Sequence, residues 1–131
     1  MLDEEALEAL RLKYGKIGVV TYNGHQIVFR KPTRDNCRDY RRMRDSASEK
    51  ADAVEFLAQV SLAAFDGELE VNKARTHYTN VFLDEFPLFA NTPKVMAVLS
   101  LLTGMVEEED AIDLGKGVSY RSARRVSTPA G

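Results

Sequence analysis

GVVTYNGHQIVFRKPT, residues 18–33, decides the fold of this chain. Two runs rich in β-branched and aromatic residues flank Asn23-Gly24, a pair that tolerates the positive φ angles of a type I′ turn. The twist of such a turn matches the twist of paired strands, so the stretch predicts a β-hairpin. Pro32 ends the second strand, and the Thr33 hydroxyl can cap a helix that follows.

The two-residue turn also fixes the register of the hairpin, because Tyr22 must then face His25. One face carries Gly18, Val20, Tyr22, His25, Ile27 and Phe29, and the other carries Ile17, Val19, Thr21, Gln26, Val28 and Arg30. Both faces are partly apolar and a lone hairpin is only marginally stable in water, so helices should cover one face. The second face, or an open edge, is left for another strand or another chain.

Most of the remaining chain has the pattern of helices, with apolar residues at helical spacing between turn and capping residues. The expected helices span residues 3–13, 34–45, 47–65, 69–85 and 93–109. Ser46 and Glu49 have the spacing of a capping box, while Thr92 and Pro93 form a helix start. The sequence therefore predicts an α+β fold that is mainly helical, with one N-terminal β-hairpin packed against a bundle of about four to five helices.

The length of 131 residues indicates one domain, which we expect to span residues 1–113 as a single compact unit. Residues 114–131 are polar and basic and have no periodicity. We expect them to form a flexible basic C-terminal tail, or one that orders on binding.

The composition indicates a soluble protein of the cytoplasm. Hydrophobic residues make up 44% of the chain, and the net charge is -2. The longest apolar run, residues 95–106, is too short to span a bilayer, and the acidic N-terminus is unlike a signal peptide. Cys37 is the single cysteine, which excludes an internal disulfide and fits a reducing compartment.

No motif for catalysis or metal binding stands out. His25 and His77 are the only histidines, and neither has a second ligand at metal-binding spacing. Cys37 lies near a helix start among arginines, but no partner base is identifiable. The glycines of residues 115–117 lack the strand and helix that flank a phosphate-binding loop. We therefore expect no enzyme activity, no metal and no cofactor.

Arginines are concentrated after the hairpin. Arg34, Arg38 and Arg41, with Arg42 beside them, recur at helical spacing and follow Arg30. Such a stripe could neutralise phosphates, so nucleic acid is one alternative partner. Aspartates are interleaved at the spacing of helical ion pairs, which favours a salt-bridged or protein-facing surface instead.

The helix expected at residues 93–109 is apolar on nearly every side, so it is either central or shared with another subunit. Because a small domain has a limited core, we expect self-association through this helix and the hairpin edge. The candidate partner-binding residues are Val19, Val28, Arg30, Arg34, Arg38, Arg41, Arg42, Val98, Leu101, Leu102 and Met105.

The order of these features is similar to that of the small tail assembly chaperones of long-tailed bacteriophages. The resemblance covers about residues 12–110 and depends on two stretches, "VFRKPTRDN" after the hairpin and "FLDEFPLFANTPKVMAVLSLLTGMVEEED" toward the end. It implies a non-enzymatic, self-associating protein that escorts the tape-measure protein during tail assembly in the host cytoplasm. It also implies that a longer form could arise by ribosomal frameshifting near Gly115-Lys116.

Two alternatives remain beside this resemblance. One is a small nucleic-acid-associated regulator that uses the basic helix at residues 34–44. The other is a phage-encoded inhibitor that binds a host protein.

Overall fold

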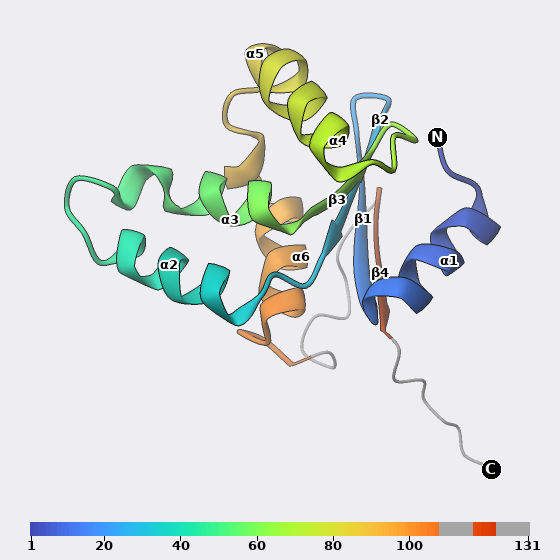
Figure 1. Ribbon diagram of the computed structural model, residues 1–131. Helices are drawn as coiled ribbons and strands as arrows, with labels where there is room; N and C mark the ends of the chain where they lie inside the picture. Colours follow the sequence, from blue (N-terminus) through green and yellow to red (C-terminus); the bar gives the residue numbers. More distant parts are fainter. Residues whose placement is uncertain (108–116, 123–131) are drawn as a thin grey trace, which may run out of the picture.

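Figure 1 shows the computed structural model, which describes residues 1–107 and 117–122. In chain order the elements are α1 (Glu4–Tyr14), β1 (Lys16–Tyr22), β2 (His25–Arg30), α2 (Arg34–Arg44), α3 (Ala53–Ser61), β3 (Leu62–Phe65), α4 (Val71–His77), α5 (Leu83–Glu85), α6 (Pro93–Thr103) and β4 (Val118–Ser122). Short helical turns lie at Lys50–Asp52, Tyr78–Phe82 and Phe89–Asn91. The expected α+β fold, mainly helical with an N-terminal hairpin packed against helices, is confirmed.

The hairpin forms the middle of an antiparallel sheet whose strand order within the described residues is β3-β2-β1-β4. The predicted register is confirmed, because Tyr22 pairs with His25, and the pairing continues inward to Gly18 and Phe29. Asn23 and Gly24 have φ angles of 48° and 82°, as a type I′ turn requires.

Helices cover both faces of the sheet, with α1 on one side and α3, α4 and α6 on the other (Figure 1). The larger core contains Val20, Ile27 and Phe29 from the hairpin, together with residues of the helices on that side. Beneath α1, a smaller cluster contains Ile17, Val19, Val28 and residues of α1 and β3. The hairpin residues of the two clusters therefore belong to the two opposite faces that the turn predicts. Gly18 permits a close approach of α6, because an added Cβ would collide with the side chain of Val98.

Local capping signals explain several helix boundaries. The Thr33 hydroxyl accepts a hydrogen bond from the Asn36 amide at 3.1 Å, which confirms the predicted cap of α2. Pro93 begins α6 as predicted, but the Thr92 hydroxyl donates to the Phe89 carbonyl at 2.8 Å instead of capping the helix. Gly104, in the left-handed conformation, ends α6 earlier than the predicted boundary at residue 109.

The helix predicted at residues 69–85 is present as α4, a π-helical turn and α5, and it ends before Phe86-Pro87. By contrast, the helix predicted at residues 47–65 is wrong at both ends. Residues 50–52 form a 3-10 turn before α3, and residues 62–65 leave the helix to become β3. All four residues of β3 are buried, so this apolar run is satisfied by pairing with β2 under helices on both sides.

The prediction of a flexible tail at residues 114–131 is wrong for residues 118–122. These residues form β4, and all five of them pair with β1, opposite Lys16 to Val20. The pairing satisfies backbone groups of β1 that would otherwise form an open edge. Residues 114–116 and 123–131, with Gly115 and Lys116 among them, lie outside the described residues.

Candidate functional site

The outer edge of β1 is the feature that the hairpin prediction left for another strand or chain, and β4 occupies it. The Thr21 amide donates to the Gly117 carbonyl at the start of this pairing. Hydrogen-bonded pairs alternate along antiparallel strands, so Val19 with Ser119 and Ile17 with Arg121 are the next bonded pairs. The intervening β1 amides, from Gly18 to Tyr22, bond to β2. Strand β1 therefore directs alternate amides to two different neighbours.

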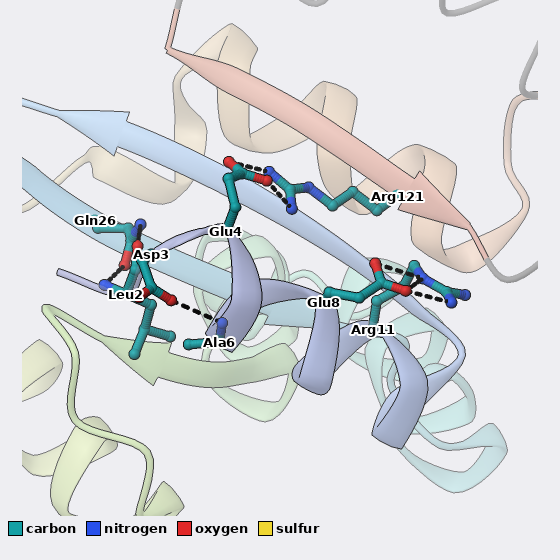
Figure 2. Close-up of polar contacts among 8 residues, drawn as sticks. All are labelled: Leu2, Asp3, Glu4, Ala6, Glu8, Arg11, Gln26 and Arg121. Carbon is teal, nitrogen blue, oxygen red and sulfur yellow. Dashed lines mark hydrogen bonds and ion pairs between the residues drawn. The ribbon is translucent and has the colours of Figure 1, made fainter.

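Helix α1 holds both the hairpin and β4 through polar contacts (Figure 2). The Glu4 carboxylate accepts hydrogen bonds from Arg121 Nη1 at 2.8 Å and Nη2 at 3.1 Å. The Leu2 amide donates to Gln26 Oε1 at 2.9 Å, and Gln26 Nε2 donates back to the Leu2 carbonyl at 3.4 Å. Asp3 caps α1 by accepting from the Ala6 amide. The first turn of α1 is therefore anchored between β2 and β4.

Strand β4 is only half-buried at every residue. Val118 and Tyr120 pack against the larger core, while Arg121 extends toward Glu4 on the α1 side. Gly117 has a φ of +80°, and an added Cβ would lie 2.9 Å from the Thr21 carbonyl oxygen and 3.1 Å from Lys94 Nζ. A glycine is therefore required where β4 begins.

Five of the candidate partner-binding residues belong to the interior of the chain. The buried side chains are those of Val19, Val28, Val98, Leu101 and Leu102. Their interpretation as side-chain contacts for a partner is therefore corrected: they form the core, and α6 is a central helix. Val19 remains at the edge through its backbone amide, which faces β4. Met105 is 53% exposed beyond the end of α6.

The predicted arginine stripe lies on the exposed side of α2. Arg34, Arg38 and Arg41 line a hollow of about 460 Å³ together with Asp35 and Cys37.

Three arginines of α2 form ion pairs: Arg38 with Asp35 at 3.2 Å, Arg42 with Glu49 at 3.5 Å and Arg44 with Asp45 at 3.3 Å. No carboxylate in residues 1–107 or 117–122 forms an ion pair with Arg34 or Arg41. The stripe is thus only partly neutralised.

Arg30 is separate from this stripe. Its guanidinium lies 5.4 Å from the centre of the Tyr14 ring, on the side of the sheet covered by α1. Burial lowers the pKa of Arg75, and the positive charge of Arg30 lowers it further. Arg75 Nη2 donates to the Val60 carbonyl at 3.3 Å. Arg30 therefore lies between the sheet and the helices, near Tyr14 of α1 and Arg75 of α4.

His25 has a partner that the sequence did not reveal. His25 Nδ1 lies 2.7 Å from Asp66 Oδ2, and Asp66 Oδ1 accepts the Gln26 amide at 2.8 Å. The imidazole also stacks on Phe65 with 5.8 Å between ring centres. An aspartate can orient a histidine for proton transfer, but no serine, threonine or cysteine of the described segments hydrogen-bonds to this ring. The pair closes the corner between β2 and β3.

A second buried polar pair joins two helical segments. Tyr78 Oη lies 3.4 Å from Glu55 Oε1, and Glu55 Oε2 is buried with no hydrogen-bond partner in the described residues. Burial raises the pKa of Glu55 from its ordinary value of 4.5 to about 7, while the hydrogen bond from Tyr78 acts in the opposite direction. The pKa of Tyr78 is raised by burial and by the Glu55 charge.

The other residues considered for chemistry are not brought together. Cys37 is half-buried on α2, and His77 is exposed at the end of α4. Among the described residues, no group of three or more histidine, cysteine or acidic side chains could hold a metal ion. None of the helices in the same segments is long and apolar enough to cross a membrane.

Comparisons of this chain with protein-family models, with curated proteins and with solved structures found no match. The function must therefore be argued from the residues of the β1 edge and of α2.

Proposed function

We propose that this chain is a non-enzymatic chaperone that binds an extended segment of another protein along the outer edge of β1. The observation that carries the proposal is that β4, from the far end of the chain, uses this edge while remaining half-buried. An edge that binds one extended segment through its backbone can bind another, since strand addition requires little of the partner's sequence.

The resemblance to tail assembly chaperones supports the same class of function and names the client as the tape-measure protein. A long protein that is kept extended during assembly presents unpaired backbone groups, which are the groups that a strand edge binds. The site of this activity would be the cytoplasm of a host cell.

Co-expression and pull-down with the tape-measure protein of a long-tailed bacteriophage tests the proposal. Val19→Pro removes the amide that faces the outer edge, whereas the matched control Val19→Ala keeps the amide and shortens only the side chain. We expect wild type and Val19→Ala to retain the client, and any fraction of Val19→Pro that far-UV circular dichroism shows to be folded to lose it. Retention by a folded Val19→Pro protein, or no retention by wild type, would overturn the proposal.

Self-association is part of the same proposal, and the exposed residues at α6 are its best candidates. Met96 is 45% exposed, and Met105 and Val106 are also exposed beyond the helix end. Large apolar side chains that are exposed on a monomer can be buried against a second copy. Sedimentation at micromolar concentration should detect an oligomer that Met96→Lys with Met105→Lys dissociates. A wild-type protein that remains monomeric at this concentration would contradict self-association.

A second candidate function is nucleic-acid binding by α2, and the incomplete neutralisation of Arg34 and Arg41 favours it. Phosphate contacts by such a stripe would give affinity that falls steeply with salt. Binding of a DNA duplex should be measured for wild type and for Arg34→Ala with Arg38→Ala and Arg41→Ala. Submicromolar, salt-dependent binding that the triple variant loses would establish this function in place of client binding.

A further inference from the structure

We infer that β4 is a self-inhibitory strand, which occupies the β1 edge until an extended segment with a basic residue opposite Glu4 displaces it. The inference rests on the proposed function, because the displacing segment would belong to the client. It adds the chemistry of that segment and the element that controls its access.

The core is complete without β4, which makes the strand separable. Every fully buried residue of the two described core clusters lies between Leu7 and Leu102. Val118 and Tyr120 are half-buried and pack against the larger cluster without being part of its fully buried set. On the opposite edge, by contrast, Leu62 and Phe65 of β3 are themselves core residues. Release of β4 would therefore uncover the β1 edge without opening the interior.

The contacts that hold β4 are of a kind that another strand can reproduce. Antiparallel pairing with β1 uses backbone groups, which every extended segment possesses. The ion pair between Glu4 and Arg121 lies at the surface, where the Glu4 side chain is 82% exposed. Surface ion pairs contribute little to stability, although they can select a partner by charge.

The side chains of β4 define what a displacing segment should contain. Positions that match Val118 and Tyr120 face the larger core, so they call for apolar or aromatic residues. The position that matches Arg121 faces Glu4, which stands beside Asp3 and Glu5 in the exposed first turn of α1. A basic residue is therefore favoured there. The partner is a β-strand segment with alternating apolar residues followed by a lysine or arginine.

Competition with a synthetic peptide tests this inference on the full chain. The probe is fluorescein-labelled GVSYRS, the sequence of residues 117–122. Two variants weaken β4 in different ways: Ser119→Pro removes an amide that bonds to β1, and Gly117→Val places a side chain where only glycine fits. Because a tethered strand has an effective concentration on the order of millimolar, we expect both variants to bind the probe at least roughly tenfold more tightly than wild type.

Charge reversal tests the role of Glu4 separately. We expect Glu4→Arg to prefer the peptide with glutamate in place of arginine, GVSYES, over GVSYRS, because the substitution weakens the tethered β4 and the GVSYRS peptide alike. Glu5→Arg is the matched control, since Glu5 lies in the same exposed turn, forms no ion pair within the described residues, and should leave the preference for GVSYRS unchanged. A purely structural role of Glu4 would lower the binding of both peptides alike.

Three results would overturn the inference. They are equal peptide binding by wild type and both weakened variants, no exchange of preference in Glu4→Arg, and a wild-type dimer that Ser119→Pro dissociates. The dimer would mean that β4 is donated to a second copy.

The peptide assay is independent of the client. Peptide exchange without client retention would therefore contradict the proposed function alone, and client retention without peptide exchange would contradict self-inhibition alone.

Discussion

The two edges of the hairpin are both closed by antiparallel strands, but the two closing strands are held very differently. On the β2 edge, β3 follows directly from α3, and all four of its residues are buried. On the β1 edge, β4 comes from the far end of the chain, and all five of its residues are half-buried.

Additional contacts reinforce the difference. Asp66 continues the β3 side by bonding to both the Gln26 backbone and His25, and α4 packs against β3 from outside. The contacts described for β4 include its backbone pairing with β1, the packing of Val118 and Tyr120 against the larger core, and the exposed pair between Glu4 and Arg121. We conclude that β3 is a permanent part of the core, whereas β4 can leave while the rest of the fold persists.

The largest effect on stability is expected from truncating a core side chain of β3, the strand that closes the β2 edge. Leu62 is 0% exposed, so Leu62→Ala should lower the free energy of unfolding by about 2–5 kcal/mol. The matched change on the other edge, Val118→Ala, should lower it by about 1 kcal/mol or less, since Val118 is half-buried. Urea denaturation followed by circular dichroism measures both values. Equal losses would contradict the distinction between the edges.

A smaller effect is expected from pH, through the buried carboxyl of Glu55 in α3. The pKa of Glu55 is raised to about 7 in the folded chain, so its contribution to stability is fully present below pH 4.5 and is lost as the pH rises through 7. Allowing for its partial exposure, the loss should be on the order of 1–2 kcal/mol.

Glu55→Gln should remove this pH dependence, because glutamine stays neutral, and should make the variant more stable than wild type at pH 8. Urea midpoints at pH 5 and pH 8 measure the effect. A wild-type profile that Glu55→Gln leaves unchanged would show that this carboxyl is not the responsible group.

The smallest effect is expected from the ion pair that holds β4. Glu4→Gln should lower stability by only about 0.2–1 kcal/mol, and the difference from wild type should shrink at high salt. Glu5→Gln serves as the control, since the exposed Glu5 lies in the same turn of α1 but takes part in no ion pair of the described residues. A much larger loss for Glu4→Gln would mean that β4 is a structural part of the core after all.

The hairpin, its register and the face each residue occupies could be predicted from sequence because they depend on local chemistry. Asn23-Gly24 selects the turn, and the turn alone fixes the pairing of neighbouring residues. The cap at Thr33 and the helix start at Pro93 are local in the same sense. An outer edge available for another strand also followed from the hairpin.

Both closing strands were missed because pairing between distant segments leaves a weak local signal. The residues of β3 continue the apolar pattern of α3, and burial on both faces removes the alternation typical of a strand. Strand β4 is short and polar, and its partner lies about one hundred residues earlier in the chain. The contact between His25 and Asp66 depends on β3, so it could not be found before β3 was known. The sequence thus indicated an edge but not its occupant.

Amide hydrogen exchange along β1 tests the difference between the edges most directly, because this one strand bonds to both sides. The Val19 amide faces β4 and the adjacent Val20 amide faces β2, so the two report on different edges at the same depth in the sheet. If β4 leaves while the core persists, Val19 and Ile17 should exchange at least roughly tenfold faster than Val20 and Gly18, relative to their intrinsic rates. Equal protection of Val19 and Val20 would contradict the account, since β4 would then open only when the whole chain unfolds.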